Sequence, residues 1–199
     1  MDKLLNRKTS SARQSARDRL LAAAGELFYE EGVQSVGIDK VIERAGVAKA
    51  SLYGNFKNKD DLVRAYLYAR YEARRAAIEA KLALHEAPRE KLLSVFDVMA
   101  EAIAQPNYRG CAFLRASAEM SAAASGREVC RNARRWTREL FSGLAKEAGA
   151  AKPDTLARQL LLIYDGTAAS AQLDPDPDVA AAARAAAEIL IDAACAKPA

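Results

Sequence analysis

Two short helical patterns separated by a single glycine are the feature that most constrains how this chain can fold. The first pattern covers residues 38–45 and the second covers residues 48–56. Gly46 lies between them and can adopt the positive φ that a tight turn between helices requires. Ala45 is small at the point where two helices would cross closely. The sequence therefore predicts a helix-turn-helix over about residues 37–56.

The second helix of this motif has two chemically different faces. Leu52 and Phe56, four residues apart, are expected to pack against the first helix. The opposite face would present to solvent Lys49, Ala50, Ser51, Tyr53 and Asn55. Side chains of these types suit contacts with base edges in the major groove and with phosphates. On the pattern alone, an ordinary helical hairpin is the alternative.

Helical spacing of apolar residues continues along the rest of the chain, and no segment alternates with period two. We predict an all-α fold of about nine helices, the first running from about Ala12 to a left-handed glycine at Gly32. Asn58 is expected to cap a long helix that follows it. Pro88 would lie in the first turn of the next helix. The last helix is expected to begin at Pro177, with Asp176 as its cap.

Charge is distributed unevenly along the 199 residues. Residues 1–85 contain 16 Lys and Arg against 11 Asp and Glu, whereas residues 86–199 contain 14 against 15. A basic arm forms the first dozen residues. The positive excess at this end indicates a polyanionic partner.

Several other classes of protein are disfavoured. Cys111, Cys130 and Cys195 are odd in number and widely spaced, which predicts neither a disulfide framework nor a zinc site. A single histidine and the lack of a nucleophile elbow or phosphate-binding glycine motif argue against an enzyme, so we expect no cofactor. Charges interrupt the most apolar late stretch, residues 179–196, and the N-terminus lacks a secretory pattern. A cytoplasmic protein is expected.

The residues around the helix-turn-helix also match one known signature in register. They are Arg19–Phe28, Glu31-Gly32, Ile38, Ala45-Gly46-Val47, Leu52–Lys59 and Leu62. In these residues the chain resembles the TetR family of transcription regulators. The resemblance implies a three-helix DNA-binding head over residues 12–58 and a helical ligand-binding and dimerisation body over residues 59–199. It further implies a homodimer that acts as a repressor by binding a palindrome in double-stranded operator DNA. Binding of a small ligand would release this homodimer from the DNA.

The same resemblance assigns roles to individual positions. Lys49, Ala50 and Ser51 would face bases, Tyr53 and Asn55 would contact bases or phosphates, and Lys59 would bind a phosphate. The chain departs from the family pattern at Gly37 and Ala48, where relatives often carry Ser or Thr. Alanine in place of serine at a helix cap costs about 1 kcal/mol, so the fold is expected to persist without two phosphate-binding hydroxyls.

The body is expected to contain the ligand site. Residues 109–114 resemble a Gly-Cys-x-Phe segment that a subgroup of these regulators carries in the sensing region. We predict a cavity for an apolar or amphipathic effector, lined by Phe96, Met99, Cys111, Phe113, Met120, Trp136, Phe141 and Tyr164. Trp136 and Tyr164 are favoured because each carries a polar atom that a dry core would have to satisfy. Plain packing in the core is the alternative for the set.

Small residues along the last two helices allow close helix approach, which predicts that the homodimer forms there. Packing within one monomer is the alternative. A second sensing hypothesis places oxidation at Cys111. A dimeric helical scaffold without a ligand is the remaining alternative from a different class.

Overall fold

The computed structural model describes residues 14–174 and 176–196, and every regular element in these ranges is a helix. The prediction of an all-α fold with nine helices is confirmed for this part of the chain. The helices are α1 (Ala16–Glu31), α2 (Ile38–Ala45), α3 (Lys49–Asn55), α4 (Lys59–Leu82), α5 (Pro88–Ile103), α6 (Ala112–Glu119), α7 (Gly126–Glu147), α8 (Pro153–Leu173) and α9 (Val179–Cys195). The basic arm and the expected helix start near Ala12 lie outside the described residues.

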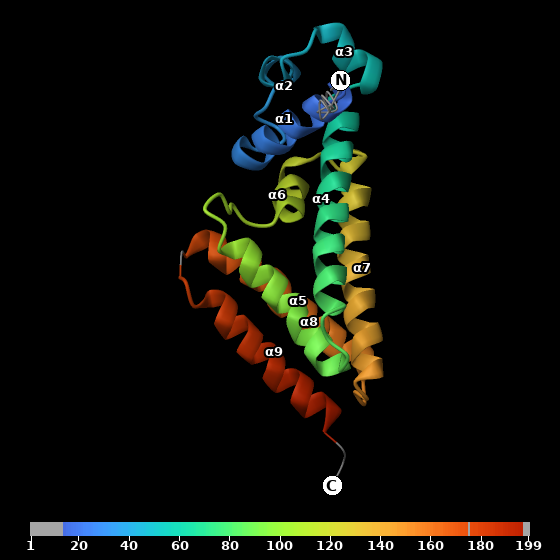
Figure 1. The fold of residues 1–199 in the computed structure, drawn as a ribbon, viewed down its shortest axis with the longest axis vertical. Helices are drawn as coiled ribbons and strands as arrows, with labels where there is room; N and C mark the ends of the chain where they lie inside the picture. The colour runs from blue at the N-terminus through green and yellow to red at the C-terminus, as the bar shows by residue number, and fades with distance from the viewer. Residues whose placement is uncertain (1–13, 175, 197–199) are drawn as a thin grey trace, which may run out of the picture.

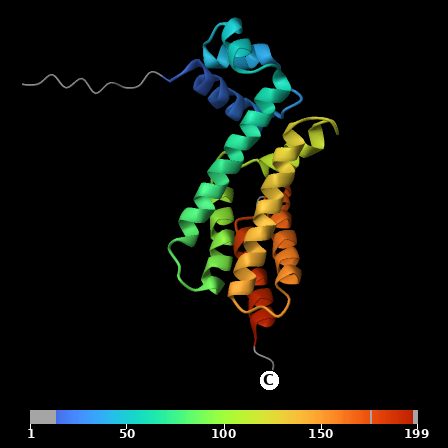
Figure 2. The ribbon, with the colours of Figure 1, turned by 90° about the vertical axis from the view of Figure 1, so that its right-hand side faces the viewer.

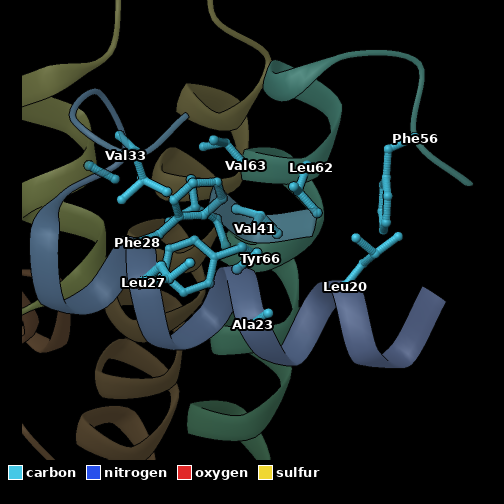
Figure 3. Close-up of a cluster of buried hydrophobic side chains, with 14 of the residues drawn as sticks. Leu20, Ala23, Leu27, Phe28, Val33, Val41, Phe56, Leu62, Val63 and Tyr66 are labelled. Atoms are coloured by element: carbon cyan, nitrogen blue, oxygen red, sulfur yellow. The ribbon is translucent and has the colours of Figure 1, made fainter. Parts of the chain in front are cut away.

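The first three helices form a head at one end of the molecule, and α4 runs from the head into the body (Figure 1). The head encloses its own apolar core, in which Leu20, Leu27 and Leu52 are completely buried. Phe28 of α1 meets Tyr66 of α4 edge to face, with ring centroids 5.6 Å apart (Figure 3). This contact attaches the upper part of α4 to the head.

The core of the head does not end at the predicted domain boundary between residues 58 and 59. The same cluster of buried side chains includes Phe113 and Met120 of the α6 region and Cys130 of α7. In Figure 1, α6 lies between the head and the lower helices. The buried core that begins in the head therefore continues through α4 into α6 and the first turns of α7.

The lower part of the body is a helical bundle with a second core, drawn from α4, α5, α7, α8 and α9 (Figure 2). Phe96, Phe141 and Tyr164 meet at its centre, with each pair of ring centroids about 6 Å apart. Three helices thus converge on one aromatic cluster.

Local sequence signals explain several of the helix starts. Ser15 begins α1 in a reciprocal capping box with Asp18, and the Asn58 side chain accepts a hydrogen bond from the Asp61 N–H at the start of α4. Pro88 is the first residue of α5, as predicted.

Two expectations about helix ends were wrong. The last helix begins at Val179 rather than Pro177, because Asp176 closes a turn before the helix by accepting the N–H of Asp178 on its side chain. Gly32 ends α1 with φ 95° and ψ 152°, which is a positive φ but not the left-handed helical conformation.

Candidate functional site

The turn between α2 and α3 has the geometry that its sequence predicts. Gly46 lies in the left-handed region, with φ 60° and ψ 43°, and its N–H bonds back to the Glu43 carbonyl. Its own carbonyl accepts a hydrogen bond of 3.1 Å from Arg19 of α1. A residue with a Cβ is disfavoured in this conformation. The glycine and the Arg19 contact together determine the direction in which α3 leaves the turn.

One face of α3 packs into the head and the other is open to solvent. Leu52 is fully buried and Phe56, just after the helix, is 3% exposed. Tyr53 is 51% exposed, and Lys49, Ala50 and Asn55 are also exposed, while Ser51 is half-buried. The five residues predicted to face solvent therefore share one helix, and all of them except the half-buried Ser51 are exposed.

Two polar side chains of this face bind to other groups of the head. The Lys49 ammonium lies 2.9 Å from Asp39 of α2, and this hydrogen bond raises the pKa of Lys49. The Asn55 amide donates to the Ser51 carbonyl over 2.7 Å. A partner that used either group would have to replace these contacts.

Lys59, the first residue of α4, contacts the turn between α1 and α2. Its ammonium donates to the backbone carbonyl of Gln34 over 3.0 Å. Burial lowers the pKa of Lys59, against an opposing effect of the nearby Glu119 carboxylate. The lysine thus holds the start of α4 against the α1–α2 turn.

The absence of Ser or Thr at Gly37 and Ala48 is visible in the helix caps. Both residues have extended backbone at the N-cap position, and neither supplies a side-chain hydrogen bond to its helix. The two helices form without those caps.

A cavity of about 650 Å³ lies in the body, between α4, α5, α6, α7 and α8. Volumes of this size are typical of small-molecule sites. Four of the eight residues predicted to line such a cavity do so: Met99, Cys111, Phe113 and Tyr164. Cys130, which the prediction did not include, lines the cavity as well, and burial raises the pKa of its thiol.

The other four predicted residues lie outside the cavity lining. Phe96 and Phe141 stack on each other in the lower core, where both side chains are almost completely buried. Met120 packs in the core next to the head, beside Gly126. Trp136 packs against Tyr71 and the Arg75 guanidinium, so its expected role as a cavity residue was wrong.

The sequence prediction missed the polar part of the cavity wall. A single acidic residue, Asp165, contributes to the lining. Five arginines also contribute, namely Arg70, Arg74, Arg127, Arg131 and Arg134. The spacing of these arginines in the sequence carries a signal for this wall. Arg70 and Arg74 are four residues apart on α4, and Arg127, Arg131 and Arg134 are spaced by four and three on α7, so that each set lies along one helix face.

Tyr29 of α1 links the cavity wall to the head by hydrogen bonds. Its hydroxyl donates to the Gly110 carbonyl over 3.0 Å and accepts from the Arg109 N–H over 2.9 Å. The Arg115 guanidinium donates to the Tyr29 carbonyl over 2.5 Å. Residues 109–115, which include Cys111 and Phe113 of the cavity wall, are thus bonded directly to α1.

Comparisons with known proteins agree with this geometry. Residues 20–66 match the family described as bacterial regulatory proteins, tetR family. The chain is 33% identical over 96 residues to the probable HTH-type transcriptional regulator ArpR of Pseudomonas putida, a match that covers 46% of each protein. The chain therefore matches only about half the length of such curated relatives.

Solved structures extend the similarity to the body. SCO4454, a TetR-family transcriptional regulator from Streptomyces coelicolor, is 32% identical, with a TM-score of 0.87 over 91% of this chain and 96% of that one. A TetR-type regulator from Streptomyces avermitilis is 34% identical, with a TM-score of 0.79 over 91% and 98% of the two chains. The chain belongs to the TetR family of DNA-binding transcriptional regulators.

Proposed function

We propose that this regulator binds a palindromic operator as a homodimer through α3, and that an effector in the body cavity releases it. The observation that carries the proposal is the solvent-exposed face of α3 around Tyr53, on a head that α4 and α6 connect to the cavity. A helix of this kind can enter the major groove with its outer side chains against base edges. We further propose that the protein acts in the cytoplasm as a repressor, so that the effector switches its target genes on.

Exposed apolar side chains on α8 and α9 support the homodimer. Leu162 of α8 is 67% exposed and Ile189 of α9 is 69% exposed, and small residues surround them on the same faces. The small exposed residues are Gly166, Ala182, Ala185, Ala186 and Ala193. Contiguous exposed apolar surface marks an interaction site, and small residues let helices approach closely. Two copies could pair these helices as a four-helix interface.

Release follows from the requirements of a palindrome. The two recognition helices of a dimer must lie about one helical turn of DNA apart, roughly 34–36 Å, or a multiple of it. Because α4 and α6 connect each head to the cavity wall, a ligand that moves either helix changes this separation. Only a ligand with different affinities for the two arrangements can shift the equilibrium.

Two exposed tyrosines provide a matched test of the DNA-binding face. Tyr53 on α3 is 51% exposed and Tyr68 on α4 is 56% exposed. We expect Tyr53→Ala to weaken binding to upstream DNA fragments in a gel shift, while Tyr68→Ala binds like the unmodified protein. Circular dichroism would establish that both variants fold. Equal binding by the two variants would contradict the assignment of α3 as the recognition helix.

A further inference from the structure

The charges around the body cavity are poorly balanced. Five guanidinium groups reach its wall and one carboxylate, Asp165, faces them. Arg134 forms an ion pair with this carboxylate over 2.7 Å. Burial nevertheless raises the pKa of Asp165, with Arg134 and Arg74 acting in the opposite direction. Among the described residues, the other four arginines of the wall form no ion pair with a carboxylate.

Of these four arginines, Arg131 lies at an exposed position, and two others are used in the protein's own structure. Arg127 donates to the backbone carbonyls of Ser117, Met120 and Ser121 over 2.6–2.9 Å, and so closes the segment between α6 and α7. The Arg70 guanidinium lies over the Tyr29 ring, 4.3 Å from its centroid. Both side chains have structural roles that explain their positions.

Arg74 is different, because its buried hydrogen-bonding capacity is only partly used. Its Nη2 donates weakly to the Ala133 carbonyl and the Thr137 hydroxyl of α7, over 3.2 and 3.3 Å. The guanidinium lies over the Phe113 ring of α6, 4.6 Å from the centroid. Its Nε is buried and has no hydrogen-bond partner among the described residues. A buried donor on a charged group that lacks a partner is strongly unfavourable.

Much of the rest of the cavity wall is apolar. Val98, Met99 and Ala102 of α5 contribute to it, together with Phe113 and Leu114 of α6 and Leu161 of α8. Such a surface favours a hydrocarbon or aromatic body. A ligand that matches the whole wall would combine an apolar body with a negatively charged group.

We infer that the effector is an amphipathic organic anion whose oxyanion, a carboxylate or a phosphate, pairs with Arg74 while its apolar body occupies the cavity. The planar guanidinium provides adjacent donors in the geometry that such an oxyanion accepts. An anion bound there would contact α4 beside α6 and α7. This inference rests on the proposed function of the cavity as the effector site.

The position of Arg74 also connects the ligand to the head. It lies 15 residues after Lys59 on α4, which corresponds to about 22 Å along the helix. The oxyanion would therefore act near the middle of α4, where α6 crosses it, rather than at the head itself. A small shift of α4 at this point would move the head.

Isothermal titration calorimetry of the full-length protein can test the charge requirement with three probes of equal chain length. The probes are dodecanoate, dodecyl phosphate and dodecan-1-ol, each below its micellar concentration. We expect at least one anion to bind about tenfold or more tightly than the alcohol, the effect expected of a charge-assisted hydrogen bond. The stronger of the two anions identifies the headgroup as carboxylate or phosphate. Equal binding of the alcohol, or binding of neither anion, would overturn the inference.

Matched arginine variants then test the assigned residue. Arg74→Gln should reduce the preference for the anion to about twofold or less, whereas Arg75→Gln should keep it, because Arg75 lies outside the cavity lining and pairs with Glu79. If Arg74→Gln does not fold, Arg74→Lys replaces it in the test. This variant keeps the charge and should retain only part of the preference. An undiminished preference in Arg74→Gln, or in Arg74→Lys where Arg74→Gln does not fold, would overturn the assignment.

Release of operator DNA, measured in parallel, separates this inference from the proposed function. An anion that binds through Arg74 without weakening DNA binding would contradict only the proposed release mechanism. Release by dodecan-1-ol at the same concentration as the anions would contradict only the charge requirement.

Discussion

The backbone N–H of Gln34 donates to Oε2 of Glu119 over 2.9 Å, which joins the turn after α1 to the last residue of α6. The Gln34 side chain returns a second hydrogen bond, of 3.0 Å, to the Glu119 carbonyl. Because α6 also contributes Phe113 and Ser117 to the cavity wall, this pair lies on a short path between the cavity and the head. We propose that ligand binding reaches the DNA-binding helices through this contact as well as through α4.

Removing the Glu119 carboxylate should weaken the coupling between effector and operator. Coupling free energies in such proteins are typically 1–3 kcal/mol, or about 5- to 150-fold in affinity. In Glu119→Ala, we expect the ratio of DNA affinities without and with effector to fall toward one. The affinity for the effector itself should change little. Glu139→Ala, at an exposed position of α7, is the control. Fluorescence anisotropy with and without effector measures the effect; full coupling in Glu119→Ala would show that this contact does not transmit it.

Neighbouring residues on α3 should separate folding from DNA binding. Leu52 is completely buried, so Leu52→Ala should lower the free energy of unfolding of the head by about 2–5 kcal/mol. Tyr53→Ala should change it little, because half of that side chain is exposed. Thermal and urea unfolding followed by circular dichroism compare the two. The opposite ranking would mean that α3 packs through its other face.

The head illustrates what the sequence could predict. Gly46 indicated a tight turn with positive φ, and the structure has one there. The apolar pair Leu52 and Phe56 indicated which side of α3 faces inward, and both side chains are buried. Both deductions depend on contacts between residues close in sequence. Asp39, ten residues before Lys49, was missed as its partner, because the ion pair depends on how α2 and α3 cross.

The body shows where sequence reasoning fails. Periodicity identified Phe96, Phe141 and Tyr164 as inward-facing, and all three are buried. It could not determine whether the space beside each is filled or hollow, since that depends on packing between distant helices. Phe96 and Phe141 fill their space by stacking, whereas Tyr164 borders the cavity. Arg74, which is half-buried, was missed because an arginine on a helix is more often fully solvated.

Neutralising Asp39 should strengthen DNA binding. Asp39 is exposed and pairs with Lys49 on the face proposed to enter the major groove. Asp39→Asn removes a negative charge from that face and frees the ammonium. We expect a lower Kd and a slope of log K against log salt that is steeper by up to about 0.9, the contribution of one phosphate contact. Glu147→Gln, which changes the net charge equally at the exposed end of α7, should leave both unchanged. Unaltered binding by Asp39→Asn would place Lys49 away from the DNA.

Charge on the exposed face of α9 should prevent dimerisation. Ala186 and Ile189 both lie on that face, whereas Ala187 between them is completely buried in the monomer. Ala186→Arg and Ile189→Arg should therefore give folded monomers in analytical ultracentrifugation and bind operator DNA poorly. Leu84→Arg, at a 73% exposed position beyond α4, is the control for adding charge at an apolar surface residue. Intact dimers in both α9 variants would move the interface elsewhere.

The most direct test of operator binding is a titration of labelled DNA with the full-length protein, followed by fluorescence anisotropy at several salt concentrations. The DNA would be fragments from upstream of the gene itself and of its neighbours, with shuffled duplexes of the same composition as controls. The account predicts that one fragment binds about a thousandfold or more tightly than its shuffled control, with one dimer at each site. It also predicts that log K falls linearly with log salt, by about 0.9 for each phosphate contacted. Equal affinity for operator candidates and shuffled DNA, or no binding at low salt, would contradict it.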